Sequence, residues 1–302
     1  MTEPPAVPAE LDGRHVLAVP RGTDLAPLAR AWFPAARWTR EPLSAAQAAA
    51  SRPMTGARFR GIAVAPVSTA GVLSLDGAVD VVGPEPLDAT DARALTLPAQ
   101  DSDLYGLPAA PVPGATITPD LLTGWATAVA RRTGGGILPV QRDRVVVPDP
   151  ASAVDLTLWS AVPLRTEDAV PLVRPALAGA RPGPVQEGTP GAPGAFSLVA
   201  TYEYDGAVAV SCARSSEVPV VLSTLDWREH GPWAYRVTWL PTDPLELELP
   251  HPSQLHVIAR QRAAPSIARV VATLWRAAGG TVVDAGGFVV PPEEVDRRAR
   301  VR

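Results

Sequence analysis

The sequence predicts an α+β protein built from two homologous halves, each an antiparallel sheet with helices on one face. The first observation is a repeated segment: residues 21–37 and 165–181 align without gaps and share Arg, Asp, Pro-Leu, Arg and Ala-Arg in that order. The second is that both halves show the same succession of strand and helix periodicities, and folds of the split β-α-β kind fit this order of elements. We therefore predict a tandem duplication with its halves in a pseudo-twofold arrangement.

Three shorter matches follow the repeated segment in the same order along both halves. They are Leu-x-Leu-Pro at 95–98 and 247–250, Gly-Gly at 134–135 and 279–280, and Val-Val-Pro at 146–148 and 289–291. The spacing between the matched segments is the length of a whole domain, far longer than a solenoid repeat. The predicted organisation is a disordered N-terminal tail at 1–12, a first repeat at 13–150, a second repeat at 154–292 and an Arg-rich C-terminal tail at 293–302. The Pro- and Gly-rich stretch 182–194 then lies inside the second repeat, as a loop.

The first repeat is predicted to open with a strand at 15–19. Apolar residues then recur at helical spacing from Asp24, and Pro34 is expected to end or kink that helix. A second helix begins at Thr118, a capping residue followed by Pro119, and ends at Gly134. The strands expected between and after the helices are 59–67, 72–82, the Leu-x-Leu-Pro segment and a short strand ending at Val147.

The second repeat shows the same pattern. A helix aligned with the first one has an apolar face at the matching positions and is expected to end near Pro175. A later helix carries one apolar stripe that runs from Ile267 to Ala278, and Gly279 follows it. The strands expected here are 196–204, 207–213, the second Leu-x-Leu-Pro segment and a short strand ending at Val290.

Composition excludes several functional classes. The 302 residues include 46% hydrophobic and 19% charged residues, which is ordinary for a globular protein. A net charge of −4 argues against a general nucleic-acid binder, although a local Arg patch is still compatible with it. There is no lysine, so neither a Schiff base to pyridoxal phosphate nor a phosphate-loop lysine is available, and the absence of lysine and asparagine suggests a GC-rich bacterial genome. We expect no cofactor.

The N-terminus lacks the basic and apolar regions of a signal peptide, and no apolar run reaches about 18 residues. These features predict a cytoplasmic protein without membrane insertion. The single cysteine, Cys212, excludes an intrachain disulfide and a zinc site of several thiolates. It lies in an apolar strand and is expected to be a small buried residue.

The halves differ most at 214–240, which we interpret as an aromatic insertion in the second repeat. Trp233, Tyr235 and Trp239 alternate along a predicted strand and so share one face. Tyr202 and Tyr204 flank an earlier turn. If the two strands are neighbours, these aromatic residues form one surface, with Asp226, Arg228, Glu229 and His230 at its edge. Aromatic residues and arginine dominate interface energetics. The predicted ligand- or partner-binding residues are Tyr202, Tyr204, Trp227, Arg228, Trp233, Tyr235 and Trp239.

Two alternatives to this surface remain open at the sequence level. In the first, the segment is an extra hairpin whose aromatic residues pack into the core and whose charged turn is solvated. In the second, Asp226, Glu229 and His230 form an acid–base group, which requires a turn because neighbouring residues of a strand point apart. The protein would then be a hydrolase or a transferase.

Other polar clusters give weaker indications. His251 and His256, near Glu246 and Glu248, have a spacing that fits no common metal site, and we expect no metal there. Asp101 and Asp103 could hold a cation, although an acidic turn is the commoner reason for such a pattern. The matched pair Arg21 and Arg165 could bind anions near helix N-termini or simply be solvated.

No Gly-x-Ser-x-Gly elbow, dinucleotide-binding glycine pattern or His-Glu-x-x-His motif is present. The sequence therefore predicts an intracellular, non-catalytic binding protein. Its site would be the cleft between the repeats or the aromatic surface of the second repeat, and its partner a protein or a small apolar molecule. Either a monomer with pseudo-dimeric halves or a homodimer fits this prediction.

Overall fold

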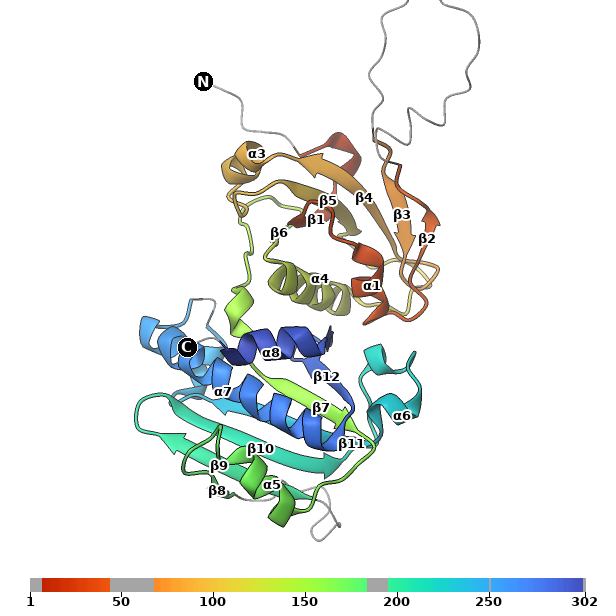
Figure 1. The fold of residues 1–302 in the computed structure, drawn as a ribbon. Coiled ribbons are helices and arrows are strands. Elements are labelled where there is room, and N and C mark those ends of the chain that lie inside the picture. The colour runs from red at the N-terminus through yellow and green to blue at the C-terminus, as the bar shows by residue number, and fades with distance from the viewer. Residues whose placement is uncertain (1–6, 44–67, 184–194, 250, 301–302) are drawn as a thin grey trace, which may run out of the picture. The chain divides into compact units, whose positions relative to one another are not determined.

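A computed structural model describes residues 7–43, 68–183, 195–249 and 251–300 (Figure 1). The chain divides into two compact units, Met1–Pro150 and Ala151–Arg302. Each unit contains one antiparallel sheet, and the described residues form seven α-helices. The protein is thus α+β, as the sequence predicts.

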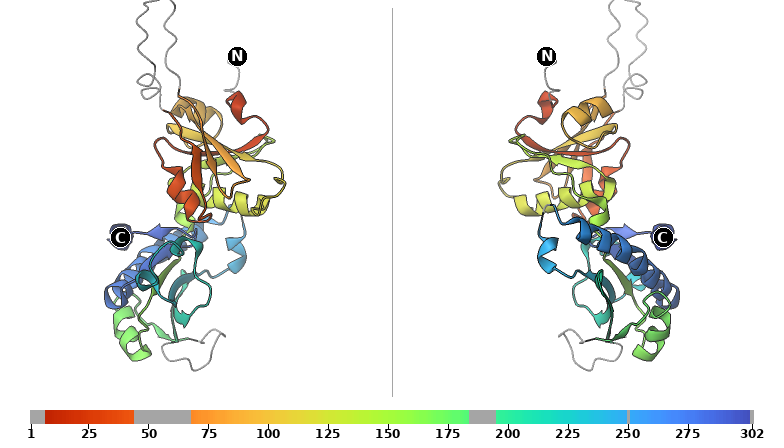
Figure 2. Two further views of the ribbon diagram at one scale, coloured as in Figure 1. Left: turned by 90° about the vertical axis from the view of Figure 1, so that its right-hand side faces the viewer. Right: turned by 90° about the vertical axis from the view of Figure 1, so that its left-hand side faces the viewer.

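The first unit contains a six-stranded sheet in the order β2-β3-β4-β5-β1-β6, with α1 and α4 on one face and α3 on the other (Figure 2). Helix α4 has the predicted ends, because the Thr118 hydroxyl caps the Leu121 amide and Gly134 adopts a left-handed conformation. The elements in chain order are η1 (Ala9–Leu11), β1 (Arg14–Pro20), α1 (Leu25–Arg30), β2 (Arg37–Arg40), β3 (Gly71–Ser74), β4 (Asp80–Leu87), α3 (Ala89–Ala94), β5 (Ser102–Pro108), α4 (Pro119–Thr133) and β6 (Gly136–Leu138).

The second unit contains a seven-stranded sheet in the order β13-β12-β7-β11-β10-β9-β8. The long helix α7 crosses one face of this sheet, and α8 packs along α7 (Figure 1). The elements are η2 (Pro150–Ser152), β7 (Leu156–Ser160), α5 (Thr166–Val173), β8 (Arg181–Pro182), β9 (Phe196–Tyr202), β10 (Gly206–Arg214), η3 (Val220–Leu222), α6 (Trp227–His230), β11 (Trp233–Leu240), η4 (Pro244–Leu247), α7 (Gln254–Ala278), β12 (Thr281–Asp284), β13 (Val289–Val290) and α8 (Pro292–Arg300).

The two sheets have the same strand order. Strands β8, β9, β10, β11, β7 and β12 of the second unit follow one another as β2, β3, β4, β5, β1 and β6 do in the first, and β13 is added at the edge. The register agrees as well: Leu17 lies opposite Tyr105 and Ile137, whereas Leu158 lies opposite Tyr235 and Val282. These pairings define equivalent positions in the two units.

The repeated segment and the Gly-Gly match both fall on equivalent elements. Helices α1 and α5 each follow the first strand of their unit, and the matched residues facing the sheet are buried in both. A Cβ atom at Gly135 would lie 2.0 Å from the Ala18 carbonyl oxygen, and one at Gly280 would lie 2.0 Å from that of Trp159. Ala18 and Trp159 occupy equivalent positions on β1 and β7, so the close approach occurs twice.

Several expected elements differ in the structure. The single strand expected at 72–82 is a hairpin of β3 and β4, because the Asp76 side chain accepts the amide hydrogens of Ala78 and Val79 and closes a turn. Neither Leu-x-Leu-Pro segment is a strand, and the two are not equivalent, since 95–98 precedes β5 whereas 247–249 follows β11. The strand expected at 59–67 lies outside the described residues.

Both predicted tails contain ordered structure in the described residues. Residues 9–11 form the short helix η1, and Leu11 is buried in the core of the first unit. At the other end of the chain, α8 covers most of the expected Arg-rich tail. Its arginines lie on the polar side, whereas Val295 is buried and Ala299 packs against the core. Amphipathic spacing within 292–300 explains this packing.

Elements cover both faces of each sheet, in contrast to the predicted single helical face. In the first unit Ala92 of α3 joins a buried cluster with Val16 and Leu104 on the face away from α4. In the second, Leu222 of η3 packs with Trp159 and Ala234 on the face away from α7. Both covering segments connect the fourth and fifth strands of their unit.

Tyr235 provides a stability prediction for the second unit. Its buried hydroxyl donates to the Val162 carbonyl oxygen at 2.6 Å and accepts the Leu164 amide hydrogen at 2.7 Å. Tyr235→Phe leaves both backbone groups without this partner, so we expect a loss of about 1–3 kcal/mol in the free energy of unfolding by urea. Tyr204→Phe is the control, since Tyr204 is 77% exposed, and equal stabilities of the two variants would contradict the prediction.

Within the described residues, no helix combines the length and apolar character needed to cross a bilayer.

Candidate functional site

The predicted aromatic residues do not form one surface. Tyr235 and Trp239 are buried in the core of the second unit, and Trp233 and Tyr202 are partly buried against it. Tyr204 and Trp227 are exposed.

The two exposed aromatic residues are also far apart along the sheet. Tyr204 precedes the start of β10, whereas Trp227 precedes β11, whose first residue pairs with the last residue of β10. They therefore lie at opposite ends of the β10–β11 pair. Arg228 stacks over the Trp227 ring at 5.5 Å, and both side chains are solvent-exposed.

The position of β11 in the sheet explains this arrangement. The predicted alternation is present, because Tyr235, Val237 and Trp239 all face the same side. That side is the core beneath α7, and β11 is the equivalent of β5, so the segment from Trp233 onward is a central strand and not an insertion. The extra hairpin weighed as an alternative is therefore absent, although its aromatic residues are indeed core residues.

The predicted acid–base residues lie around the short helix α6 but do not engage one another. Asp226 caps the helix by accepting the Arg228 amide hydrogen at 2.9 Å, and Glu229 is exposed. His230 is buried, and its Nδ1 lies 3.3 Å from the Gly231 carbonyl oxygen. The structure shows no hydrogen bond between His230 and a carboxylate in the described residues.

The histidine and acidic clusters have structural roles. His256 is buried against Trp239, with ring centroids 4.8 Å apart, and Glu246 accepts the Ser253 amide hydrogen. No group of three potential metal ligands occurs in the described residues. Cys212 is buried, and this burial raises the pKa of its thiol to about 12, which makes it unreactive.

The matched arginines differ between the units. Arg21 pairs with Asp101 at 2.9 Å and also lies 3.9 Å from Asp103, so both acids lie beside the arginine, and Asp103 also accepts the Gly22 amide hydrogen. Arg165 is exposed and lies 3.8 Å from Glu167.

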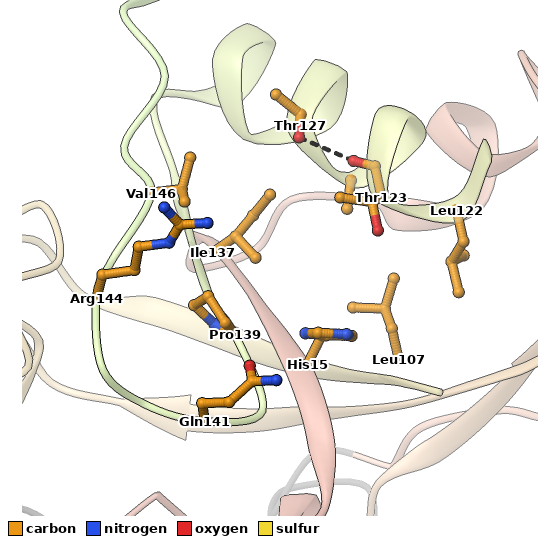
Figure 3. Close-up of a pocket in the computed structure, with 11 residues that line it drawn as sticks. His15, Leu107, Leu122, Thr123, Thr127, Ile137, Pro139, Gln141, Arg144 and Val146 are labelled. Atoms are coloured by element: carbon orange, nitrogen blue, oxygen red, sulfur yellow. Dashed lines mark hydrogen bonds between the residues drawn. The ribbon is translucent and has the colours of Figure 1, made fainter. Parts of the chain in front are cut away.

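A pocket of about 230 Å³ opens in the first unit between α4 and the sheet (Figure 3). One wall comes from α4, and the other comes from β1, β5, β6 and the segment that follows β6. The lining residues are His15, Leu107, Leu122, Thr123, Ala126, Thr127, Ile137, Pro139, Gln141, Arg144 and Val146.

His15 presents a hydrogen-bond donor to this pocket. Its Nδ1 accepts the Val140 amide hydrogen at 3.1 Å, so the neutral ring carries its proton on Nε2. Burial lowers the pKa of His15, and the nearby Arg142 guanidinium lowers it further. Arg142 is held in place by the carbonyl oxygens of Leu138 and Pro139. His15 is thus neutral near pH 7, and Nε2 has no partner among the described residues.

Three further donors surround the same space. Figure 3 shows the Gln141 side chain turned toward His15, and the Arg144 guanidinium beside Ile137 and Val146. Thr123 lines the pocket from α4. Within the part of the chain that the structure describes, no hydrogen bond or ion pair engages the side chains of Gln141 and Arg144 or the Thr123 hydroxyl. The pocket therefore combines apolar walls with unengaged donors.

In the second unit the equivalent positions are buried. By strand register His15 is equivalent to Leu156, and counting back from Gly134 and Gly279 makes Thr123 and Thr127 equivalent to Ala268 and Ala272. The remaining equivalent pairs are apolar in both units: Leu107 and Val237, Leu122 and Ile267, Ala126 and Val271, Ile137 and Val282, and Val146 and Val290.

Helix α8 packs against α7 in the second unit and contributes to the same core. All eight counterparts of the pocket residues belong to one buried cluster, which also contains Val295 of α8 and contacts Ala299. In the described residues of the first unit no α-helix follows β6 before the unit ends. The first unit thus keeps open, with three polar side chains, a space that the second unit fills with apolar ones.

Sequence reasoning missed this pocket. His15 lies in an apolar strand, and its relation to Leu156 depends on a strand register that the sequence did not provide. The two threonines could have been identified from the sequence, because the Gly-Gly match alone aligns Thr123 with Ala268 and Thr127 with Ala272.

Comparison of the chain with protein-family models, with curated proteins and with solved structures found no significant match to any of them.

Proposed function

We propose that this chain is a binding protein whose first unit holds a small molecule in the pocket between α4 and the sheet. The observation that carries the proposal is the difference between equivalent positions. Where the second unit has Leu156, Ala268 and Ala272 sealed beneath α8, the first has His15, Thr123 and Thr127 around an open space. Concave sites with apolar walls and a few convergent polar groups are typical of ligand sites.

We also infer that the two units are duplicated copies of one ancestral fold. Their common strand order, their matching register and the repeated close approach at Gly135 and Gly280 support this inference. The open pocket then reflects divergence after the duplication, because among the described residues only the second copy has a helix such as α8 after its last strands.

The exposed aromatic residues support a partner surface less well. Trp227 and Tyr204 stand singly at opposite ends of β10 and β11, and isolated exposed apolar residues are normal on protein surfaces. The convergence of several hydrogen-bond donors on the apolar walls of one pocket is a more specific feature.

Obstructing the pocket tests the proposal. Hexanoate, hexanamide and hexylammonium serve as probes, with binding detected by saturation-transfer NMR and affinity measured by calorimetry. We expect at least one probe to bind the wild-type chain, and Thr127→Phe, which places a ring in the pocket, to weaken that binding at least about tenfold. Thr123→Phe is a second obstructing variant at an exposed position on the same helix.

Leu121→Phe is the matched control, because Leu121 is exposed on α4 and does not line the pocket. It should bind as the wild type does. Failure of all three probes to bind, or binding that survives both obstructing variants, would refute the proposed site.

A further inference from the structure

We infer that the ligand of the first unit is a small monocarboxylate with a short apolar tail; this inference rests on the proposed binding function. The carboxylate would lie among Arg144, His15 and Gln141, and the tail against the apolar residues of α4, β5 and β6. Charge, hydrogen-bonding groups and size each point to this class.

The charged and hydrogen-bonding groups around the pocket favour an anion. Arg144 carries a permanent positive charge, and no carboxylate is among the described lining residues. The positive charge of Arg142 lies close enough to affect the titration of His15. An arginine guanidinium binds a carboxylate through two parallel hydrogen bonds, which explains the preference for a planar anion.

Neutral hydrogen-bond donors complete the anion site. The Nε2–H group of His15 and the amide nitrogen of Gln141 can each donate to a carboxylate oxygen. A carboxylate accepts several hydrogen bonds at once, whereas an ammonium group only donates, and neither the Arg144 guanidinium nor the Nε2–H group of His15 can accept from it. The same groups therefore discriminate against cationic ligands.

The apolar walls and the size of the pocket define the rest of the ligand. Leu107, Leu122, Ala126 and Ile137 supply an apolar lining that offers no partner to a polar tail. The share of volume of one water molecule in the liquid is about 30 Å³, so a pocket of about 230 Å³ accommodates roughly eight such volumes. A carboxylate with a tail of a few carbons, such as hexanoate, matches that size.

Calorimetric titration with three ligands of one length tests this inference. Hexanoate carries the anion, hexanamide replaces it with a neutral group of similar shape, and hexylammonium reverses the charge. At low ionic strength we expect the full chain to bind hexanoate at least about tenfold more tightly than hexanamide, and hexylammonium most weakly. Arg144→Gln should bring the affinities for hexanoate and hexanamide to within about threefold of each other.

Arg93→Gln, which removes an exposed arginine from α3 on the other face of the sheet, is the matched control and should retain the preference. Equal binding of hexanoate and hexanamide to the wild type would overturn the inference, and so would a preference that survives Arg144→Gln. If hexanoate and hexanamide bind equally and Thr127→Phe abolishes the binding of both, the charge preference is refuted but the proposed binding site is retained. Absence of binding by every probe would refute the site itself.

Discussion

Replacing Gly135 or Gly280 with alanine is expected to lower the free energy of unfolding by at least about 3 kcal/mol in the unit concerned. The added Cβ atom would lie 2.0 Å from a backbone carbonyl oxygen of β1 or of β7. Such an overlap can be relieved only by moving the first strand, which pairs with two neighbours in each unit. Gly280 also has a φ of 111°, which an alanine adopts only with strain.

Urea unfolding followed by far-UV circular dichroism measures this loss. Gly124→Ala is the control. Gly124 lies within helix α4, and an added Cβ atom would lie 3.7 Å from the Trp32 ring, which is an ordinary contact distance. Alanine favours the helix at that site, so a gain of up to about 1 kcal/mol is expected there. If Gly135→Ala or Gly280→Ala were as stable as the wild type, the close approach shared by the two units would be wrong.

Val295→Asp is expected to destabilise the second unit by about 3 kcal/mol or more. Val295 is 3% exposed and belongs to the buried cluster beneath α8. A carboxylate at this position loses its hydration and finds an apolar environment, so α8 must detach or the residue must be protonated. Detachment would open the region that is equivalent to the pocket of the first unit.

The effect is measured by urea unfolding together with hydrogen exchange of the α8 amides. Glu293→Asp introduces the same residue at an exposed position in the first turn of the helix, and its effect should stay within about 0.5 kcal/mol. Unchanged stability and unchanged exchange in Val295→Asp would show that α8 does not close this region.

Local rules predicted a large part of the fold. The strand at 15–19 and the helix from Pro119 to Gly134 depend on apolar periodicity, a capping threonine and a terminating glycine, all of which operate within a few residues. The strands at 196–202 and 206–214 likewise follow from their residue pattern. These features need no knowledge of distant contacts.

Features that depend on long-range pairing were not predictable in the same way. Alternation places Tyr235 and Trp239 on one face, but only the position of β11 beneath α7 shows that this face is the core. The two Leu-x-Leu-Pro segments match in sequence but not in position, because one precedes the fifth strand of its unit and the other follows it. A central strand was therefore interpreted as an insertion.

The pocket shows what local sequence rules can predict and what depends on long-range pairing. His15 becomes significant only when the strand register places it opposite Leu107 and makes it equivalent to Leu156. The arginine content of 293–302 predicts a tail, and only the packing of Val295 and Ala299 shows that α8 belongs to the core. Thr123 and Thr127 were the one part of the site that the repeat alone could have indicated.

Chemical-shift mapping with hexanoate tests the central claim most directly. In ¹H–¹⁵N spectra of the full chain, we expect the largest shifts at His15, at 122–127 and at 140–146, with the equivalent positions of the second unit, such as Leu156, Ala268 and Ala272, unchanged. Shifts confined to other parts of the chain, or shifts of equal size at both sets of positions, would contradict an open ligand site that is specific to the first unit.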